Sequence, residues 1–191
     1  MSKRLSLCGI LIALSACAYI PQRATIHPRV DYRQSNVGGG KAVSVSVLDE
    51  RSSSSLGHRG TAYGAAARIS TDQNVAEVFR RAIFRGLEAN GFRPEDYNQS
   101  VPTQLQVQIR TIRYSTHEGF WTGGIEAKAA IQVRASAQGR DYLKFYRYAD
   151  RERVVFVPTA SHNSQLINTA VDGVLKKMFR DPGLMATLSG N

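Results

Sequence analysis

Two segments of the chain repeat apolar residues at helical spacing. Between residues 74 and 90 the apolar positions are Val75, Val78, Phe79, Ala82, Ile83 and Leu87. Residues 164–180 repeat the pattern with Ile167, Ala170, Val171, Val174, Leu175, Met178 and Phe179. Stripes of this kind are the buried faces of amphipathic helices. We therefore predict two helices, the first of them capped by Asn74 together with Glu77 three residues later.

Four other segments alternate apolar and polar residues, which is the period of a strand with one buried face. Residues 42–48 alternate in this way, and every odd position of residues 125–137 is apolar. Residues 105–114 begin with the same alternation but shift phase after Ile109, which predicts a β-bulge. Residues 142–157 form the last segment, and a tight turn at residues 138–141 joins it to the third.

The resulting order is β-α-β-β-β-α, which predicts an α+β fold. We expect a two-layer sandwich, with two amphipathic helices on a mostly antiparallel sheet of about four strands. A single domain would span residues 42–191. Residues 17–41 are polar, contain Pro21 and Pro28 and end in three glycines. They favour a flexible tether with a reach of about 25 Å, although residues 24–30 could instead add a short edge strand.

The first residues have the layout of a secretory signal peptide. Lys3 and Arg4 precede an apolar run at residues 5–14, which is too short to span a membrane. The tetrad of Leu14, Ser15, Ala16 and Cys17 that follows resembles the lipobox of bacterial lipoproteins in all four positions. A buried free cysteine in an N-terminal helix is the alternative interpretation of Cys17.

The lipobox resemblance implies a lipid anchor. Residues 1–16 would be removed, the Cys17 thiol would receive a diacylglycerol, and the new amino group would be acylated. Two or more acyl chains hold a protein stably on a membrane. Residue 18 is alanine and not the aspartate that favours inner-membrane retention, so the resemblance implies the periplasmic face of the outer membrane. We expect no cofactor apart from these covalent chains.

The 191-residue chain carries 25 Lys and Arg against 15 Asp and Glu, a formal charge of +10. Removing residues 1–16 would delete two basic residues and no acidic one, leaving +8. Three of the remaining cations, Arg113, Lys128 and Arg134, lie on neighbouring predicted strands. They would form a basic sheet face that attracts anionic glycolipids or lipid headgroups, or a solvated surface without a ligand. Export argues against nucleic acid as the partner.

No residue pattern predicts catalysis or a metal site. The four histidines, at positions 27, 58, 117 and 162, are far apart and lack a cysteine partner. The sequence contains no Gly-x-Ser-x-Gly motif. Phe120 and Trp121 lie in a glycine-rich connection between two predicted strands and are candidate contacts for an envelope partner. The alternative is that both rings fold back over the edge of the core.

The order of several features resembles the YajG-type outer-membrane lipoproteins of Gram-negative bacteria. These features are the lipobox at Cys17, Thr25 and Ile26 with Pro28, the strand leading to Asp49, Glu50 and Arg51, the helix end at Asn90, Gly91 and Phe92, and the helix through residues 171–178. The resemblance supplies no catalytic residue. We therefore expect a non-enzymatic lipoprotein with a periplasmic binding or scaffolding domain. The alternative is an accessory component of an envelope machine for lipopolysaccharide assembly or secretion, by fold analogy.

Overall fold

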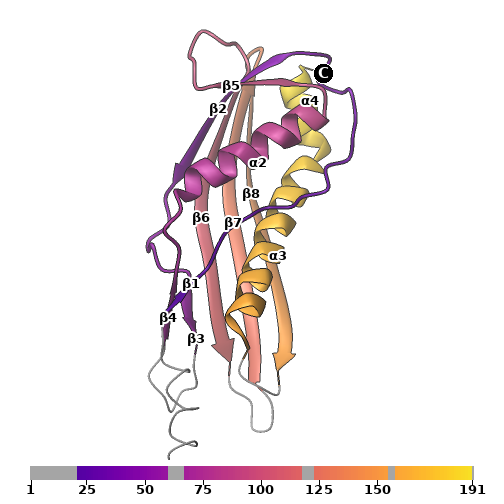
Figure 1. Ribbon diagram of the computed structural model, residues 1–191. Coiled ribbons are helices and arrows are strands. Elements are labelled where there is room, and N and C mark those ends of the chain that lie inside the picture. Colours follow the sequence, from indigo (N-terminus) through magenta and orange to yellow (C-terminus); the bar gives the residue numbers. More distant parts are fainter. Residues whose placement is uncertain (1–20, 60–66, 118–122, 155–157, 191) are drawn as a thin grey trace, which may run out of the picture.

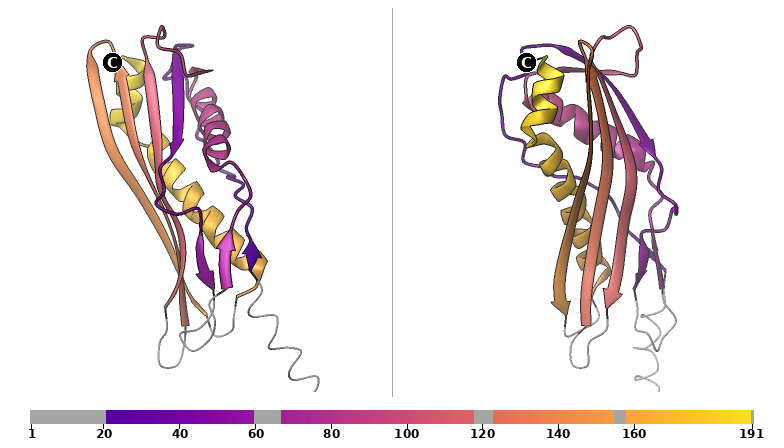
Figure 2. Two further views of the ribbon diagram at one scale, coloured as in Figure 1. Left: turned by 90° about the vertical axis from the view of Figure 1, so that its left-hand side faces the viewer. Right: turned by 180° about the vertical axis from the view of Figure 1, so that it is seen from behind.

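The computed structural model describes residues 21–59, 67–117, 123–154 and 158–190. Within these ranges, eight strands form one mixed sheet and three helices cover one of its faces (Figure 1 and Figure 2). The strands are β1 Gln22–Arg23, β2 Ala42–Asp49, β3 Gly57–Arg59, β4 Ala67–Ser70, β5 Arg93–Asp96, β6 Gln104–His117, β7 Gly123–Ala137 and β8 Arg140–Val154. The helices are α2 Val75–Ala89, α3 Ala160–Phe179 and α4 Pro182–Ser189.

The local predictions for the long elements are confirmed. The side chain of Asn74 caps α2 by accepting a hydrogen bond from the Glu77 amide at 3.1 Å. The predicted bulge is present, since the register between β6 and β7 shifts between Ile109 and Thr111. The two-residue turn between β7 and β8 is formed by Gln138 and Gly139, both with positive φ, as tight hairpins require.

The predicted sheet of about four mostly antiparallel strands is wrong in strand number and in part of its direction. The strands β6, β7 and β8 form an antiparallel meander. However, β2 lies parallel to both β5 and β6, and four of the seven strand pairings in the described ranges are parallel. The missed strands, β1, β3, β4 and β5, have two to four residues each. Such short segments show too little alternation to be recognised.

One long strand, β6, changes partner along its length. Its residues 104–109 pair with β2, whereas Tyr114 pairs with Gly57 of β3. The last bond on the β2 side runs from the Glu50 amide to the Ile109 carbonyl at 3.0 Å, and the next runs from the Tyr114 amide to Leu56 at 2.6 Å. Between them, residues 110–113 pair with no described strand on this edge. We call this place the strand exchange.

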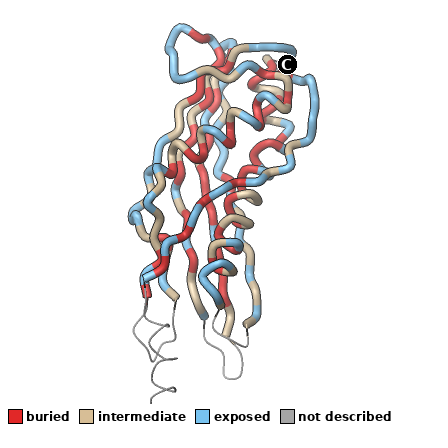
Figure 3. The backbone as a smooth tube through the Cα atoms, in the orientation of Figure 1, coloured by how far each residue is buried: buried red, intermediate tan, exposed pale blue. Residues whose placement is uncertain are grey.

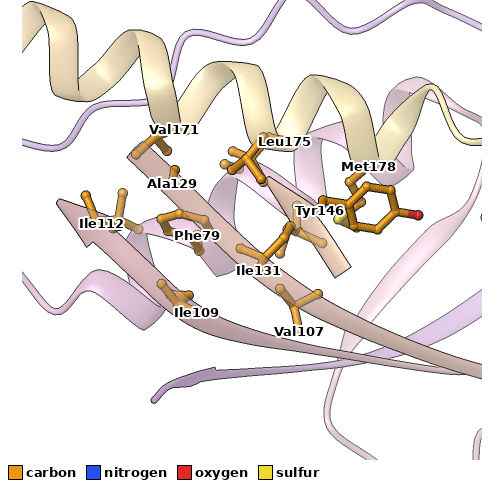
Figure 4. Packing of buried hydrophobic residues seen from close by; sticks show 14 of the residues in the cluster. Phe79, Val107, Ile109, Ile112, Ala129, Ile131, Tyr146, Val171, Leu175 and Met178 are labelled. Atoms are coloured by element: carbon orange, nitrogen blue, oxygen red, sulfur yellow. The ribbon is translucent and has the colours of Figure 1, made fainter. Parts of the chain in front are cut away.

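The core lies between the helices and the sheet face that they cover (Figure 3). Phe79 of α2 and Val171 and Leu175 of α3 point toward Ile109 of β6 and Ile131 of β7 (Figure 4). All five side chains have no exposed surface. A fully buried side chain of this size contributes about 1.5–3 kcal/mol relative to an exposed one. The predicted arrangement of helices on one sheet face therefore holds, with the additional helix α4 packed against β7 and β8.

The flexible tether predicted for residues 17–41 is wrong from residue 21 onward. Residues 21–41 run across the helices as a strap (Figure 1), with Ala24 and Ile26 almost fully buried. Two amide side chains replace a neighbouring strand. Gln73 bonds both the amide and the carbonyl of Ile26, at 2.6 and 3.1 Å, and Asn168 bonds the His27 amide and the Thr25 carbonyl. These bonds satisfy backbone groups that a free tether would leave to water.

A cluster of polar side chains around Asp181 stabilises the N-terminus of α4. The Asp181 carboxylate caps the helix by accepting from the Gly183 amide at 2.9 Å, and it also accepts from Tyr142, Lys144 and Tyr146. Burial alone would raise the pKa of Asp181, but the hydrogen bonds from these partners outweigh it and lower the pKa from 3.8 to about 2. Asp181 is therefore more acidic in the folded state than in the unfolded chain.

This pKa gives Asp181 a defined effect on stability. A lowered folded-state pKa contributes stability that is present above about pH 4 and is lost as the pH falls through about 2. We expect Asp181→Asn to reduce the free energy of unfolding by about 2 kcal/mol at pH 7, and the difference from wild type to shrink between pH 4 and pH 2. Urea unfolding across this range measures it. Asp141→Asn, an exposed control, should change stability by less than about 0.5 kcal/mol, and a pH-independent loss in Asp181→Asn would contradict the assignment.

Candidate functional site on the uncovered face of the sheet

The face of β2, β6, β7 and β8 that turns away from the helices carries polar side chains in register. Two rows of cross-strand neighbours run over the four strands. The first row consists of Ser46, Gln106, Arg134 and Leu143, and the second consists of Leu48, Gln108, Gln132 and Phe145. Each row therefore has polar side chains at its centre and an apolar side chain on β8.

Exposed hydrophobic side chains gather at this end of the uncovered face. On β8, Leu143 is 59% exposed and Phe145 is 39% exposed, and Leu48 and Tyr97 are exposed on the opposite side of β6 and β7. Tyr97 and Arg134 line a pocket of about 550 Å³. The guanidinium of Arg147 lies 4.3 Å from the centre of the Phe145 ring, a cation–π contact. We call Leu48, Tyr97, Arg134, Leu143, Phe145 and Arg147 the distal patch, because they lie far from Gln22.

The three predicted basic residues do not form one site. Arg113 and Lys128 are direct cross-strand neighbours on β6 and β7. Arg134 lies six residues further along β7 than Lys128, which corresponds to about 20 Å in an extended strand. One small anionic group therefore cannot contact all three side chains, and Arg134 belongs to the distal patch.

Lys128 forms an ion pair with a neighbouring carboxylate. Its Nζ lies 2.6 Å from Oε2 of Glu126, which is only 1% exposed, and Arg151 also donates to Glu126. Burial would raise the pKa of Glu126, but the two cations outweigh it and hold the pKa below its usual value. Lys128 is therefore a structural partner of Glu126, whereas Arg113 and Arg134 form no ion pair in the described part of the chain.

A second pocket, of about 250 Å³, opens at the strand exchange. Its lining includes Arg51, Arg110 and Arg113 together with His58 and several serines. The sequence analysis selected Arg113 but assigned no binding role to residues 49–55. The phase shift after Ile109 was the available signal, since bulges often redirect side chains beside functional sites.

The other predicted site residues lie outside the described ranges. These are Leu14, Ser15, Ala16 and Cys17 of the lipobox and the aromatic residues Phe120 and Trp121. Their roles stay predictions. The described residues on either side of 118–122 belong to paired strands, since His117 lies opposite Gly124 and Gly123 lies opposite Val154.

Metal ligands and membrane-spanning helices were also sought within the described ranges. No group of three or more His, Cys, Asp or Glu side chains in those ranges can hold a metal ion. None of the helices α2, α3 and α4 is long and apolar enough to cross a membrane.

Comparison with known proteins places the chain among bacterial lipoproteins with a mixed α/β fold. It belongs to the family Lipoprotein_16, described as uncharacterized lipoprotein, whose family model matches residues 28–189. No curated protein matches the sequence. The narrower resemblance to YajG-type lipoproteins stays a prediction.

Several solved structures are similar to the chain, including the following two. Protein XCC0632 from Xanthomonas campestris is 12% identical with a TM-score of 0.48, and the match covers 90% of this chain and 95% of that one. Lipoprotein GNA1162 from Neisseria meningitidis is 10% identical with a TM-score of 0.39, and the match covers 74% of this chain and 99% of that one.

Proposed function

We propose that this lipoprotein is a non-enzymatic scaffolding protein of the outer membrane. Cys17 carries a diacylglycerol and an N-acyl chain at the periplasmic face, and the domain binds an envelope protein through the distal patch. Membership in a lipoprotein family supports the anchor. The outer-membrane position rests on the lipobox with alanine at position 18.

The beginning of the described chain supports a fixed orientation on the membrane. Gln22 already pairs with Ile69 of β4, so four residues lie between Cys17 and the folded domain, and Gln22 is five residues along the chain from Cys17. Such a segment spans no more than about 18 Å. Gln22 and the ends of β6 and β8 lie at the same end of the molecule (Figure 1). In the proposed orientation this end is close to the bilayer and the distal patch is directed into the periplasm.

The observation that carries the proposal is the composition of the distal patch. Tyr, Phe and Arg are enriched at the centres of protein interfaces, where they contribute most of the binding energy. Here the exposed Phe145 ring contacts Arg147, and the exposed Tyr97 lines a pocket together with Arg134. A partner surface that carries acidic groups next to apolar groups would match both the charge and the exposed rings. Arg134 lies ten residues along β7 from Gly124, about 33 Å. This separation supports a patch that lies beyond the anchoring headgroups in the proposed orientation.

Membrane fractionation tests the anchor. Because acyl chains on Cys17 would be the attachment, Cys17→Ala should abolish acyl labelling and release the protein from the outer-membrane fraction. Cys8→Ala, a cysteine within the predicted leader, is the matched control and should leave labelling and fractionation unchanged. Labelling that persists in Cys17→Ala would refute the anchor.

Site-specific photocrosslinking in the same cells tests the patch. A photoreactive residue at Phe145 should give a defined crosslinked protein, and adding Arg134→Glu should reduce its yield at least tenfold because the patch would lose its positive charge. A photoreactive residue at the exposed position Glu88 on α2 is the control. Identical products from both positions, or a yield that Arg134→Glu leaves unchanged, would exclude the distal patch as the interface.

A further inference from the structure

The pocket at the strand exchange is a second feature of the uncovered face, separate from the distal patch. It exists because β6 passes from β2 to β3 and leaves residues 110–113 without a described neighbour on that edge. The chain after β2 forms the opposite wall. The full lining is Arg51, Ser52, Ser53, Ser55, Gly57, His58, Arg110, Thr111, Ile112 and Arg113. This lining contains three guanidinium groups and no carboxylate.

Arg51 is the unusual side chain of this pocket, because it is only 7% exposed. Asp49 holds it through two bonds of 2.7 Å, one to Nε and one to Nη2. This hydrogen bonding lowers the pKa of Asp49. The remaining nitrogen, Nη1, is buried and has no hydrogen-bond partner among the described residues. Buried donors are nearly always paired, so an unpaired one points to an acceptor such as an ordered water or an ion.

The other two arginines, Arg110 and Arg113, add positive charge from the β6 wall of the pocket. Arg110 is paired with Glu50 at 2.5 Å, and Glu50 does not line the pocket. The side chain of Arg113 forms no ion pair or hydrogen bond in the described part of the chain. Ser52 also has no described partner, so its hydroxyl is available beside these guanidinium groups. The lining of the pocket thus combines three guanidinium groups, one of them unpaired, with a hydroxyl.

We infer that this pocket binds a phosphoryl group. Guanidinium groups present planar forks of donors that match the oxygen atoms of phosphate, and a serine hydroxyl adds a donor of different geometry. The volume of about 250 Å³ is below the range of about 300–1,000 Å³ for pockets of drug-sized ligands. The ligand is therefore a small anionic group and not a long apolar chain.

The phosphoryl group can come from inorganic phosphate or from a phospholipid headgroup. Arg113 lies opposite Lys128, four residues from Gly124 at the end of β7, or about 13 Å along the strand. A headgroup would be within reach only in the membrane orientation proposed above, and this part of the inference rests on the proposed function. Binding of inorganic phosphate does not depend on that orientation.

Titration calorimetry on the full chain in detergent tests the pocket with inorganic phosphate. We expect saturable binding, at least tenfold weaker in Arg113→Gln. Arg113 is exposed and unpaired, so its replacement should leave folding intact. Replacing Arg51 is less suitable, because it would leave the Asp49 carboxylate without its hydrogen-bond partner. Ser52→Ala should weaken binding about threefold. Arg33→Gln, at an exposed arginine of the strap that does not line the pocket, is the control and should bind as wild type does.

Vesicle flotation distinguishes the two phosphate sources. Vesicles of phosphatidylcholine alone are compared with vesicles that also contain phosphatidic acid, which presents a phosphomonoester. Binding to phosphatidic acid that Arg113→Gln reduces tenfold would identify the headgroup as a ligand, even if the Cys17 anchor test fails. Phosphate binding without vesicle binding would identify a free phosphate ligand. No binding in either assay, or equal binding by wild type and Arg113→Gln, would overturn the inference.

Discussion

Replacing Gly57 with alanine should be the most destabilising single change at the strand exchange. Gly57 has a φ of +129°, and a Cβ atom there would lie 2.0 Å from the carbonyl oxygen of Tyr114. That oxygen belongs to the paired strand β6, so the contact cannot be relieved by rotating a side chain. Backbone strain and overpacking each cost about 1–3 kcal/mol. We expect Gly57→Ala to reduce the free energy of unfolding by about 4 kcal/mol, measured by urea denaturation.

Gly139→Ala is the matched control for this change. Gly139 also has a positive φ, of +77°, but nothing lies within 4 Å of the position where its Cβ would be. It should therefore show only the backbone cost, about 1 kcal/mol. If the two variants lost the same stability, the close approach of β3 to β6 would not be the cause.

Ile26→Ala should have the second largest effect, because the strap is part of the core. Ile26 is 1% exposed, although the sequence places it in a polar segment between two prolines. Truncating a buried isoleucine to alanine costs about 2–5 kcal/mol, and we expect about 3 kcal/mol here. The urea midpoint should fall without a change in the slope of the transition.

Thr25→Ala controls for changes in the strap that do not involve the core. Thr25 is exposed, and its contact with Asn168 uses the backbone carbonyl, which alanine retains. Its replacement should change stability by less than about 0.5 kcal/mol. Equal, small effects of both substitutions would mean that residues 21–41 behave as a tether after all.

The sequence predicted those parts of the fold that depend on local periodicity. The stripe of α2, the alternation of β7 and the bulge after Ile109 are all properties of adjacent residues. Strand direction is different, because alternation tells which face is buried but not which strand lies alongside. The parallel pairing of β2 with β6 therefore had no sequence signal. The strap was missed for a related reason, since Gln73 and Asn168 stabilise it from distant positions in the chain.

For the candidate sites, too, the sequence predicted residues that belong to a local pattern and missed residues that depend on distant contacts. Arg113 could be identified because it faces outward from a recognisable strand. Arg51 could not, since arginine in a serine-rich loop is normally solvated and its burial depends on Asp49. The distal patch joins residues of four segments that meet only in the folded sheet, so no pattern of adjacent residues indicates it.

The strap also constrains the order in which the molecule folds. Strands β6, β7 and β8 are consecutive and joined by short connections, so they can pair early with little loss of chain entropy. The side chain of Gln22, by contrast, bonds Asn163, and the His27 amide bonds Asn168, each 141 residues further along the chain. These contacts cannot form until α3 has folded and packed against the sheet. The first described residues are therefore among the last to become ordered. The described segment nearest Cys17 packs against the domain only after the rest of the chain has folded.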